Sequence, residues 1–148
     1  MIFFVVFYTE MLNIKPNKIE MDRMKVAYIF KTNMASTFQL ATMILPQLEI
    51  GIHGVDVVGM FFFDDNLYVL REGDEIGMRL NKLAKEKGIL IMACDQCAVR
   101  RNMAEGTFEM CGTGSVKPKN MIETATLGCF PQLYAALGSN PPNLVITL

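Results

Sequence analysis

The sequence predicts a single α/β domain of three layers, with a mostly parallel sheet of about five strands and helices on both faces. Short apolar and β-branched runs alternate along the chain with segments of helical periodicity. The run Ile89 to Ala93 is apolar throughout, as expected for a strand that is buried on both faces of a parallel sheet. The chain has 148 residues and is 51% hydrophobic, which is enough for one sizeable core.

Five segments are expected to be strands because they are rich in apolar and β-branched residues and end at polar turns, glycine or proline. In chain order they are Lys25 to Phe30, Val55 to Phe63, Ile89 to Ala93, Thr124 to Leu127 and Leu144 to Leu148. The turn Lys31-Thr32-Asn33 follows the first strand, and an acidic loop, Asp64-Asp65-Asn66, follows the second.

A helix that carries Arg100 and Arg101 is expected directly after the two-cysteine loop, and three further helices are expected between the strands. Ser36 or Thr37 is predicted to cap the first, in which Pro46 should produce a kink. Its expected apolar face consists of Phe38, Ala41, Ile44, Leu45 and Leu48. The second runs from Asp74 to Lys87, with acidic residues early, lysines late and Gly88 at its end. The third begins near Pro131 and ends at Gly138.

The segment after Arg101 has a looser pattern, with several glycines and Pro118. It is expected to be a long loop, with one turn of helix around Asn102 to Glu105 and a short helix from Lys119 to Glu123.

The domain is expected to span residues 24–148, preceded by an extension of residues 1–23. Ile2 to Tyr8 is apolar but too short to cross a bilayer, and it lacks the flanks of a signal peptide. We expect the extension to be a wrongly assigned start, a loose tail or a strand that docks on a partner subunit.

The chain carries 14 basic and 15 acidic residues, so its net charge is near zero. The composition therefore does not indicate the excess of positive charge that binds nucleic acid or an anionic membrane. Four cysteines in a core-rich domain indicate a reduced, cytoplasmic protein. No cofactor and no metal are expected. Zinc is a minority interpretation, because Cys111 and Cys129 are too far apart in sequence to form a second paired ligand motif.

Two cysteines follow the buried strand directly, in the order Cys94-Asp95-Gln96-Cys97. Such a pair at a strand-to-helix junction can lower a thiol pKa from about 8.5 to roughly 3.5–7.5. In a parallel sheet, reacting groups gather at the carboxyl ends of the strands. We therefore expect Cys94, Cys97 and, if the strand before it forms, Cys129 to share one edge. His53 belongs to a loop at the opposite edge.

The run Cys94 to Arg101, together with Phe61-Phe62-Phe63 and the terminal segment Pro131 to Leu148, resembles the DsrE/DsrF-like family, which includes TusD-type sulfur-relay subunits and YchN-like proteins. In the relay members, a cysteine six residues before paired arginines accepts sulfur as a persulfide. The resemblance implies that Cys94 has this role here, although the pattern does not require Cys97. It also implies a homo-oligomer, often a trimer or hexamer.

The leading hypothesis is a sulfurtransferase-like carrier that accepts sulfane sulfur on Cys94 and passes it between donor and acceptor proteins. Arg100, Arg101 and Asn33 are the expected anion-binding residues, and for at least one of the arginines an ordinary solvated side chain is the favoured interpretation. The carboxylate of Asp95 should oppose ionisation of the adjacent Cys94 thiol. Two alternatives remain: a thiol-disulfide redox protein that uses Cys94 and Cys97, and a non-catalytic oligomeric binding domain whose cysteines only pack.

Overall fold

The computed structural model describes residues 22–107, 110, 112–113 and 115–148. Almost all of the expected N-terminal extension, with its apolar segment Ile2 to Tyr8, lies outside the described residues, and so does Cys111.

The core of the fold is a five-stranded sheet in the order β6-β3-β2-β1-β7, in which every pair of neighbours is parallel. The strands are β1 (Lys25–Phe30), β2 (Asp56–Phe62), β3 (Leu90–Cys94), β6 (Ala125–Gly128) and β7 (Leu144–Thr147). All five lie within a residue or two of the predicted segments, and the predicted fold class is confirmed. The carboxyl ends of β2, β3 and β6 therefore meet at one edge of the sheet.

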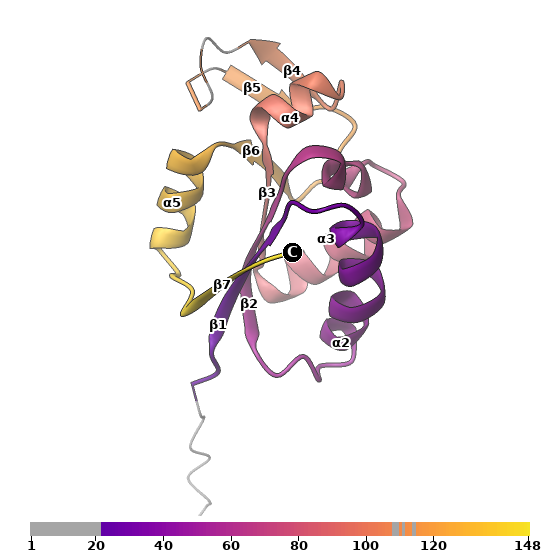
Figure 1. The fold of residues 1–148 in the computed structure, drawn as a ribbon, viewed down its shortest axis with the longest axis vertical. Helices are drawn as coiled ribbons and strands as arrows, with labels where there is room; N and C mark the ends of the chain where they lie inside the picture. The colour runs from indigo at the N-terminus through magenta and orange to yellow at the C-terminus, as the bar shows by residue number, and fades with distance from the viewer. Residues whose placement is uncertain (1–21, 108–109, 111, 114) are drawn as a thin grey trace, which may run out of the picture.

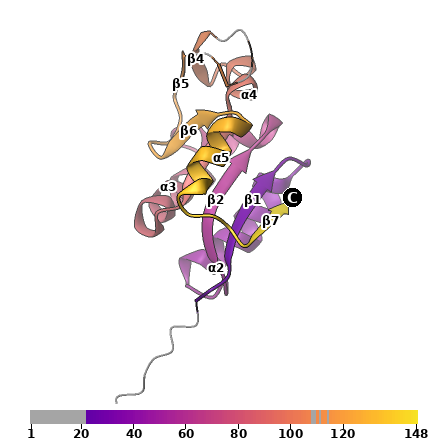
Figure 2. The ribbon, with the colours of Figure 1, turned by 90° about the vertical axis from the view of Figure 1, so that its left-hand side faces the viewer.

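Helices cover both faces of the sheet unequally. Figure 1 shows α2 (Leu45–Glu49) and α3 (Glu75–Lys87) on one side and α5 (Phe130–Gly138) alone on the other. Figure 2 shows α5 lying across the strands on its side of the sheet. The larger core lies under α2 and α3, where Leu45, Leu80 and Leu83 are buried. A smaller cluster packs beneath α5 and includes Leu133 and Cys94.

Helix α3 is the helix that the sequence predicts most closely. The Asp74 side chain caps it by accepting hydrogen bonds from the amides of Ile76 and Gly77. Gly88 ends it in a left-handed conformation, at a φ of 68°, which glycine adopts without strain. The predicted end at Gly88 is confirmed, and the helix starts one residue after the predicted Asp74, which caps it.

The first helix differs from the prediction. It is a π-helix, η1 (Ala35–Ile44), that begins after Met34 in a left-handed conformation and continues into α2. Ser36 and Thr37 therefore lie inside it and do not cap it. The wider turn buries Ser36 and Leu40, four residues apart, and leaves Phe38 49% exposed. Pro46 stands at the start of α2, where the helix type changes.

Three predicted loop features are also corrected. The acidic segment after β2 is a 3-10 helix, η2 (Asp64–Leu70). After the short helix α4 (Asp95–Arg100), β4 (Ala104–Thr107) and β5 (Ser115–Pro118) form an antiparallel hairpin. The helical turn expected at Asn102 to Glu105 is therefore wrong. The helix expected at Lys119 to Glu123 is also absent, and Met121 pairs instead with Arg71 in an isolated bridge.

None of the helices in the described part of the chain is both long enough and apolar enough to span a membrane.

Candidate functional site: a thiol pocket at the carboxyl edge of the sheet

A pocket of about 580 Å³ opens at the carboxyl edge of the sheet, and Cys94, Cys97 and Cys129 all line it. We call it the thiol pocket. Its other lining residues are Phe63, Asp64, Asp65, Tyr68, Gln96, Arg100, Arg101 and Phe130. The three thiols come from the exit of β3, the first turn of α4 and the residue after β6. The structure thus brings together the cysteines that the sequence assigns to this edge, all of them reduced.

Cys94 lies at the junction between β3 and α4. It is the last residue of the strand and the N-cap of the helix, and its Sγ accepts a hydrogen bond from the amide of Cys97 over 3.5 Å. The residue is buried, with 6% of its surface exposed, and packs with Phe61, Met92 and Leu133. Cys94 therefore forms the inner wall of the thiol pocket.

Cys97 lies in the first turn of α4 and is half-buried. Its Sγ accepts a hydrogen bond from the backbone amide of Asp64 over 3.4 Å, at the exit of β2. The pKa of the Cys97 thiol is lowered to about 7, chiefly because the Cys94 thiol hydrogen-bonds to its sulfur. Burial and the Asp64 carboxylate oppose this shift of the pKa, while the Asp64 amide and Arg101 support it. The surroundings of Cys97 thus favour its thiolate form.

Arg101 is fixed beside Cys97. Its guanidinium forms an ion pair with Asp65 at 2.8 Å, approaches Asp64 at 3.7 Å and donates to the backbone carbonyl of Cys97 over 3.2 Å. With these contacts, Arg101 orders the 3-10 helix η2 against α4. Arg100 is exposed, and within the described residues no carboxylate lies close enough to form an ion pair with it. Arg100 is thus the cation that remains open to an incoming anion.

Cys129 follows β6 and is the N-cap of α5. Its side chain accepts from the backbone of Gln132, and the Gln132 side chain accepts from the Cys129 amide over 3.0 Å. This reciprocal arrangement holds Cys129 in the lining of the pocket.

Asp95 is buried beside Cys94, and backbone amides hydrogen-bond to its carboxylate. One of its carboxylate oxygens accepts from the amide of Gly112 over 2.8 Å, and the other accepts from Gln96 over 2.7 Å. Gln132 donates to the Gly112 carbonyl over 2.8 Å from the other side. Asp95 and Gln132 thus hold Gly112 in position, and Asp64 is a carboxylate that opposes ionisation of Cys97.

The structure does not bring every expected residue to this site. Asn33 is exposed in the turn after β1 and is not part of the pocket lining. His53 lines a separate pocket with the amino ends of β1 and β2, so its predicted place at the opposite edge is confirmed.

Sequence reasoning missed the aromatic walls, Phe63, Tyr68 and Phe130. Phe63 and Phe130 stand directly beside predicted strand or helix ends, and their rings lie 5.8 Å apart. Their position beside these ends is the sequence signal that could have assigned them to the pocket.

The fold is that of a single-domain α/β protein with a five-stranded parallel sheet, and a cysteine stands at the end of its third strand. Among solved structures, the chain is similar to the YchN protein from E. coli, with a TM-score of 0.55 over 85% of this chain and 99% of that one. The two sequences are 13% identical, so the likeness shows the fold. Neither a family model nor a curated protein sequence matches the chain.

Proposed function

We propose that this protein is a sulfane-sulfur carrier of the sulfur-relay type, in which Cys97 and Cys94 act as one unit. The proposal rests chiefly on one observation: a half-buried thiol with a pKa lowered to about 7 shares a pocket with a second, hydrogen-bonded thiol. A thiolate is the nucleophile in sulfur transfer, and a thiol that ionises near ambient pH combines thiolate content with nucleophilicity.

In the loading step, the Cys97 thiolate attacks the outer sulfur of a donor persulfide. A new S–S bond forms between Cys97 Sγ and that sulfur, the donor's own S–S bond breaks, and the donor leaves as its thiolate. Arg100 lines the same pocket and is positioned to attract an anionic donor. Attack by an acceptor thiolate on the bound outer sulfur then passes it on and regenerates the Cys97 thiolate.

Our proposal assigns different roles to the two thiols from those that the family resemblance implies. The resemblance assigns the sulfur to Cys94, but Cys94 is buried, whereas Cys97 is the more exposed thiol and has a lowered pKa. In our proposal Cys94 stabilises the Cys97 thiolate by hydrogen bonding. Cys129, which lines the same pocket, is a second acceptor to which the sulfur can move.

A thiol-disulfide redox function is the second candidate, because the thiols of Cys94 and Cys97 are hydrogen-bonded. In that case, the Cys94 thiolate attacks Cys97 Sγ of the persulfide, a disulfide forms and hydrosulfide leaves. The two thiols are oxidised and the outer sulfur is reduced, so no further oxidant is required. Release of sulfide distinguishes this disulfide-forming reaction from transfer of the sulfur to an acceptor by a carrier.

We further propose that the carrier works in a reduced, cytoplasmic compartment as a homo-oligomer, with partner proteins that donate and accept sulfur. Self-association is supported by the sheet face beneath α5, because α5 covers only part of it. This side of the molecule exposes Phe130, Tyr134 and Val145, which line an apolar pocket of about 210 Å³. Monomeric proteins rarely leave a contiguous apolar surface of this kind uncovered.

To test the carrier function, the reduced protein is incubated with a low-molecular-weight persulfide and its intact mass is measured with the sulfide in solution. Stable addition of one sulfur atom without release of sulfide supports a carrier. Sulfide release with loss of two thiols supports the redox function instead. If the wild type and the Cys94→Ser/Cys97→Ser double variant take up the same amount of sulfur, both functions are wrong. Circular dichroism controls for folding of the variant.

A further inference from the structure

A second pocket, of about 380 Å³, lies at the amino edge of the sheet, opposite the thiol pocket. We call it the basic pocket. It is lined by residues from the amino ends of β1 and β2, the loop before β2 and the end of α3. Its volume falls within the range of about 300–1,000 Å³ that is usual for small-molecule sites. Nothing in the proposed sulfur chemistry uses it.

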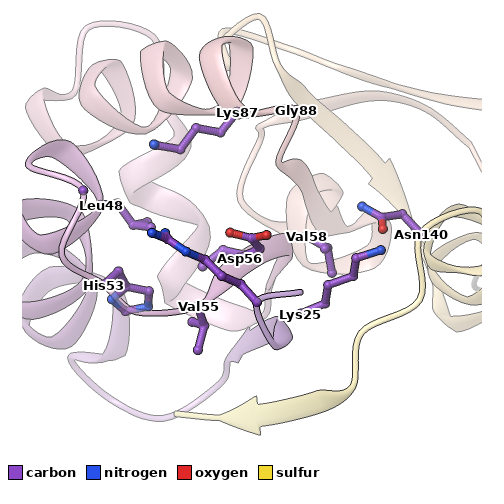
Figure 3. Close-up of a pocket in the computed structure, with 12 residues that line it drawn as sticks. Lys25, Leu48, His53, Val55, Asp56, Val58, Lys87, Gly88 and Asn140 are labelled. Carbon is purple, nitrogen blue, oxygen red and sulfur yellow. The ribbon is translucent and has the colours of Figure 1, made fainter. Parts of the chain in front are cut away.

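Three cations line the basic pocket: Arg23, Lys25 and Lys87. Within the described residues, none of them has a carboxylate at ion-pair distance. Figure 3 shows Lys87 reaching over the pocket from the helix side, with Lys25 and Asn140 across from it. Asp56 is the single acidic residue of the lining, so the formal side-chain charge is +3 − 1 = +2. The pocket thus presents a net positive charge that is matched to a dianion.

The remaining lining suits the rest of a small ligand. Leu48, Val55 and Val57 supply apolar surface. His53 accepts or donates hydrogen bonds at both ring nitrogens, to the Tyr28 hydroxyl at 2.8 Å and to Gln47 at 2.9 Å. Its ring is therefore held in place at the pocket wall. At Gly51 and Gly88 an added Cβ would meet no atom within 4 Å, so the walls at these two residues border open space.

From this arrangement we infer that the basic pocket binds a small phosphate monoester. The phosphate lies among Lys25, Lys87 and Arg23, with Asn140 as a further donor, and the organic group lies against Leu48 and Val55. A phosphate monoester carries close to two negative charges at neutral pH, and lysine and arginine are its usual partners in proteins. A free phosphate ion shares this charge, so the two ligands must be separated by experiment.

The test is a titration of the ¹⁵N-labelled protein with phenyl phosphate and, separately, with inorganic phosphate at constant ionic strength, followed by amide chemical shifts. We expect saturable shifts at His53, Gly88 and Asn140, with tighter binding of phenyl phosphate. No saturable shift with either probe would refute the site. Saturation with inorganic phosphate alone would refute the monoester and leave a phosphate-ion site.

Two variants are expected to change the affinity for phenyl phosphate in opposite directions. A folding defect could weaken binding but could not tighten it, so the pair separates loss of the site from loss of the fold. Lys87→Gln should weaken binding of phenyl phosphate about tenfold, since one charge-assisted contact is lost. Asp56→Asn should tighten it, because it removes the opposing charge. Lys82→Gln is the matched control: it lies on the same helix and makes the same change in charge, but it is 77% exposed and outside the pocket. Equal weakening by Lys82→Gln and Lys87→Gln would show a general charge effect and contradict the inference.

Discussion

The backbone amide of Asp64 donates a hydrogen bond to Sγ of Cys97 over 3.4 Å, although the two residues are 33 positions apart in sequence. The contact joins the exit of β2 to the first turn of α4. Asp64 acts on the thiol in two opposing ways, since its amide stabilises the thiolate and its carboxylate repels it. The reactivity of Cys97 therefore depends on how η2 is held against α4.

The first prediction concerns the ionisation of Cys97. Its rate of alkylation by iodoacetamide, followed by peptide mass spectrometry, should rise with pH with a midpoint near 7, because its pKa is about 7. In Cys94→Ala the largest stabilising contact is lost, so the midpoint should move up towards about 8.5, the ordinary thiol value. A midpoint that stays in place would show that Cys94 does not stabilise the thiolate.

The charges around Cys97 should move the same midpoint in opposite directions. Asp64→Asn removes a repelling charge and should lower the pKa of Cys97, while Arg101→Gln removes an attracting charge and should raise it. The rise in Arg101→Gln should be smaller than in Cys94→Ala, because Arg101 contributes least to lowering the pKa. The same alkylation profile measures all three variants, and a rise in Asp64→Asn would contradict the assignment.

Asn66 should be important for stability because it holds η2 to the start of the first helix. Its side chain accepts from the buried amide of Ser36 over 2.9 Å and donates to the carbonyl of Thr32 over 3.1 Å. Asn66→Ala leaves that amide buried without its acceptor, and we expect a loss of about 1–3 kcal/mol in the free energy of unfolding. Urea denaturation measures it; a loss below about 0.5 kcal/mol would show that water replaces the side chain.

Gly77 allows α3 to pack closely on η2. A Cβ at this position would lie 2.2 Å from the backbone carbonyl oxygen of Val69, which cannot move without displacing η2. Gly77→Ala should therefore destabilise the protein by about 1–3 kcal/mol. Gly138→Ala is the matched control on α5, where an added Cβ meets no atom within 4 Å. Equal unfolding free energies for the two variants in urea would refute this packing argument.

The proposed self-association should depend on the face beside α5. Tyr134 is 67% exposed and Val145 is 49% exposed there. Tyr134→Glu and Val145→Glu should each shift the protein towards the monomer in sedimentation velocity. Met78→Glu is the control, since Met78 is 49% exposed on α3, across the sheet. A monomeric wild type, or dissociation by Met78→Glu as well, would count against this interface.

The sheet and the location of the cysteines could be predicted because both follow from local patterns. Each strand is a short apolar run that ends at a turn, and parallel pairing then places the ends of β3 and β6 at one edge. The cap at Asp74 and the end at Gly88 are also local signals. From these residues alone, three of the thiol-pocket residues, Cys94, Cys97 and Cys129, could be assigned to one edge.

The remaining features depend on contacts between distant residues. The hairpin of β4 and β5 forms by cross-strand pairing, such as Gly106 with Val116, within a segment whose glycines indicate a loop. The relative reactivity of the two thiols depends on the amide of Asp64 and on the burial of Cys94, neither of which the spacing of cysteines encodes. The family resemblance implies Cys94 as the sulfur-carrying residue, whereas we propose Cys97 because of its exposure and its contact with Asp64.

The most direct test of the central proposal is to locate the first sulfur. The reduced wild type, Cys94→Ser and Cys97→Ser are each mixed briefly with a low-molecular-weight persulfide at pH 7 and quenched with an alkylating agent. Fragmentation mass spectrometry of the peptide that contains both cysteines then gives the loaded position. Our account predicts the added sulfur on Cys97 in the wild type, slower loading of Cys97 in Cys94→Ser and almost none in Cys97→Ser. Loading of Cys94 at an undiminished rate in Cys97→Ser would contradict it.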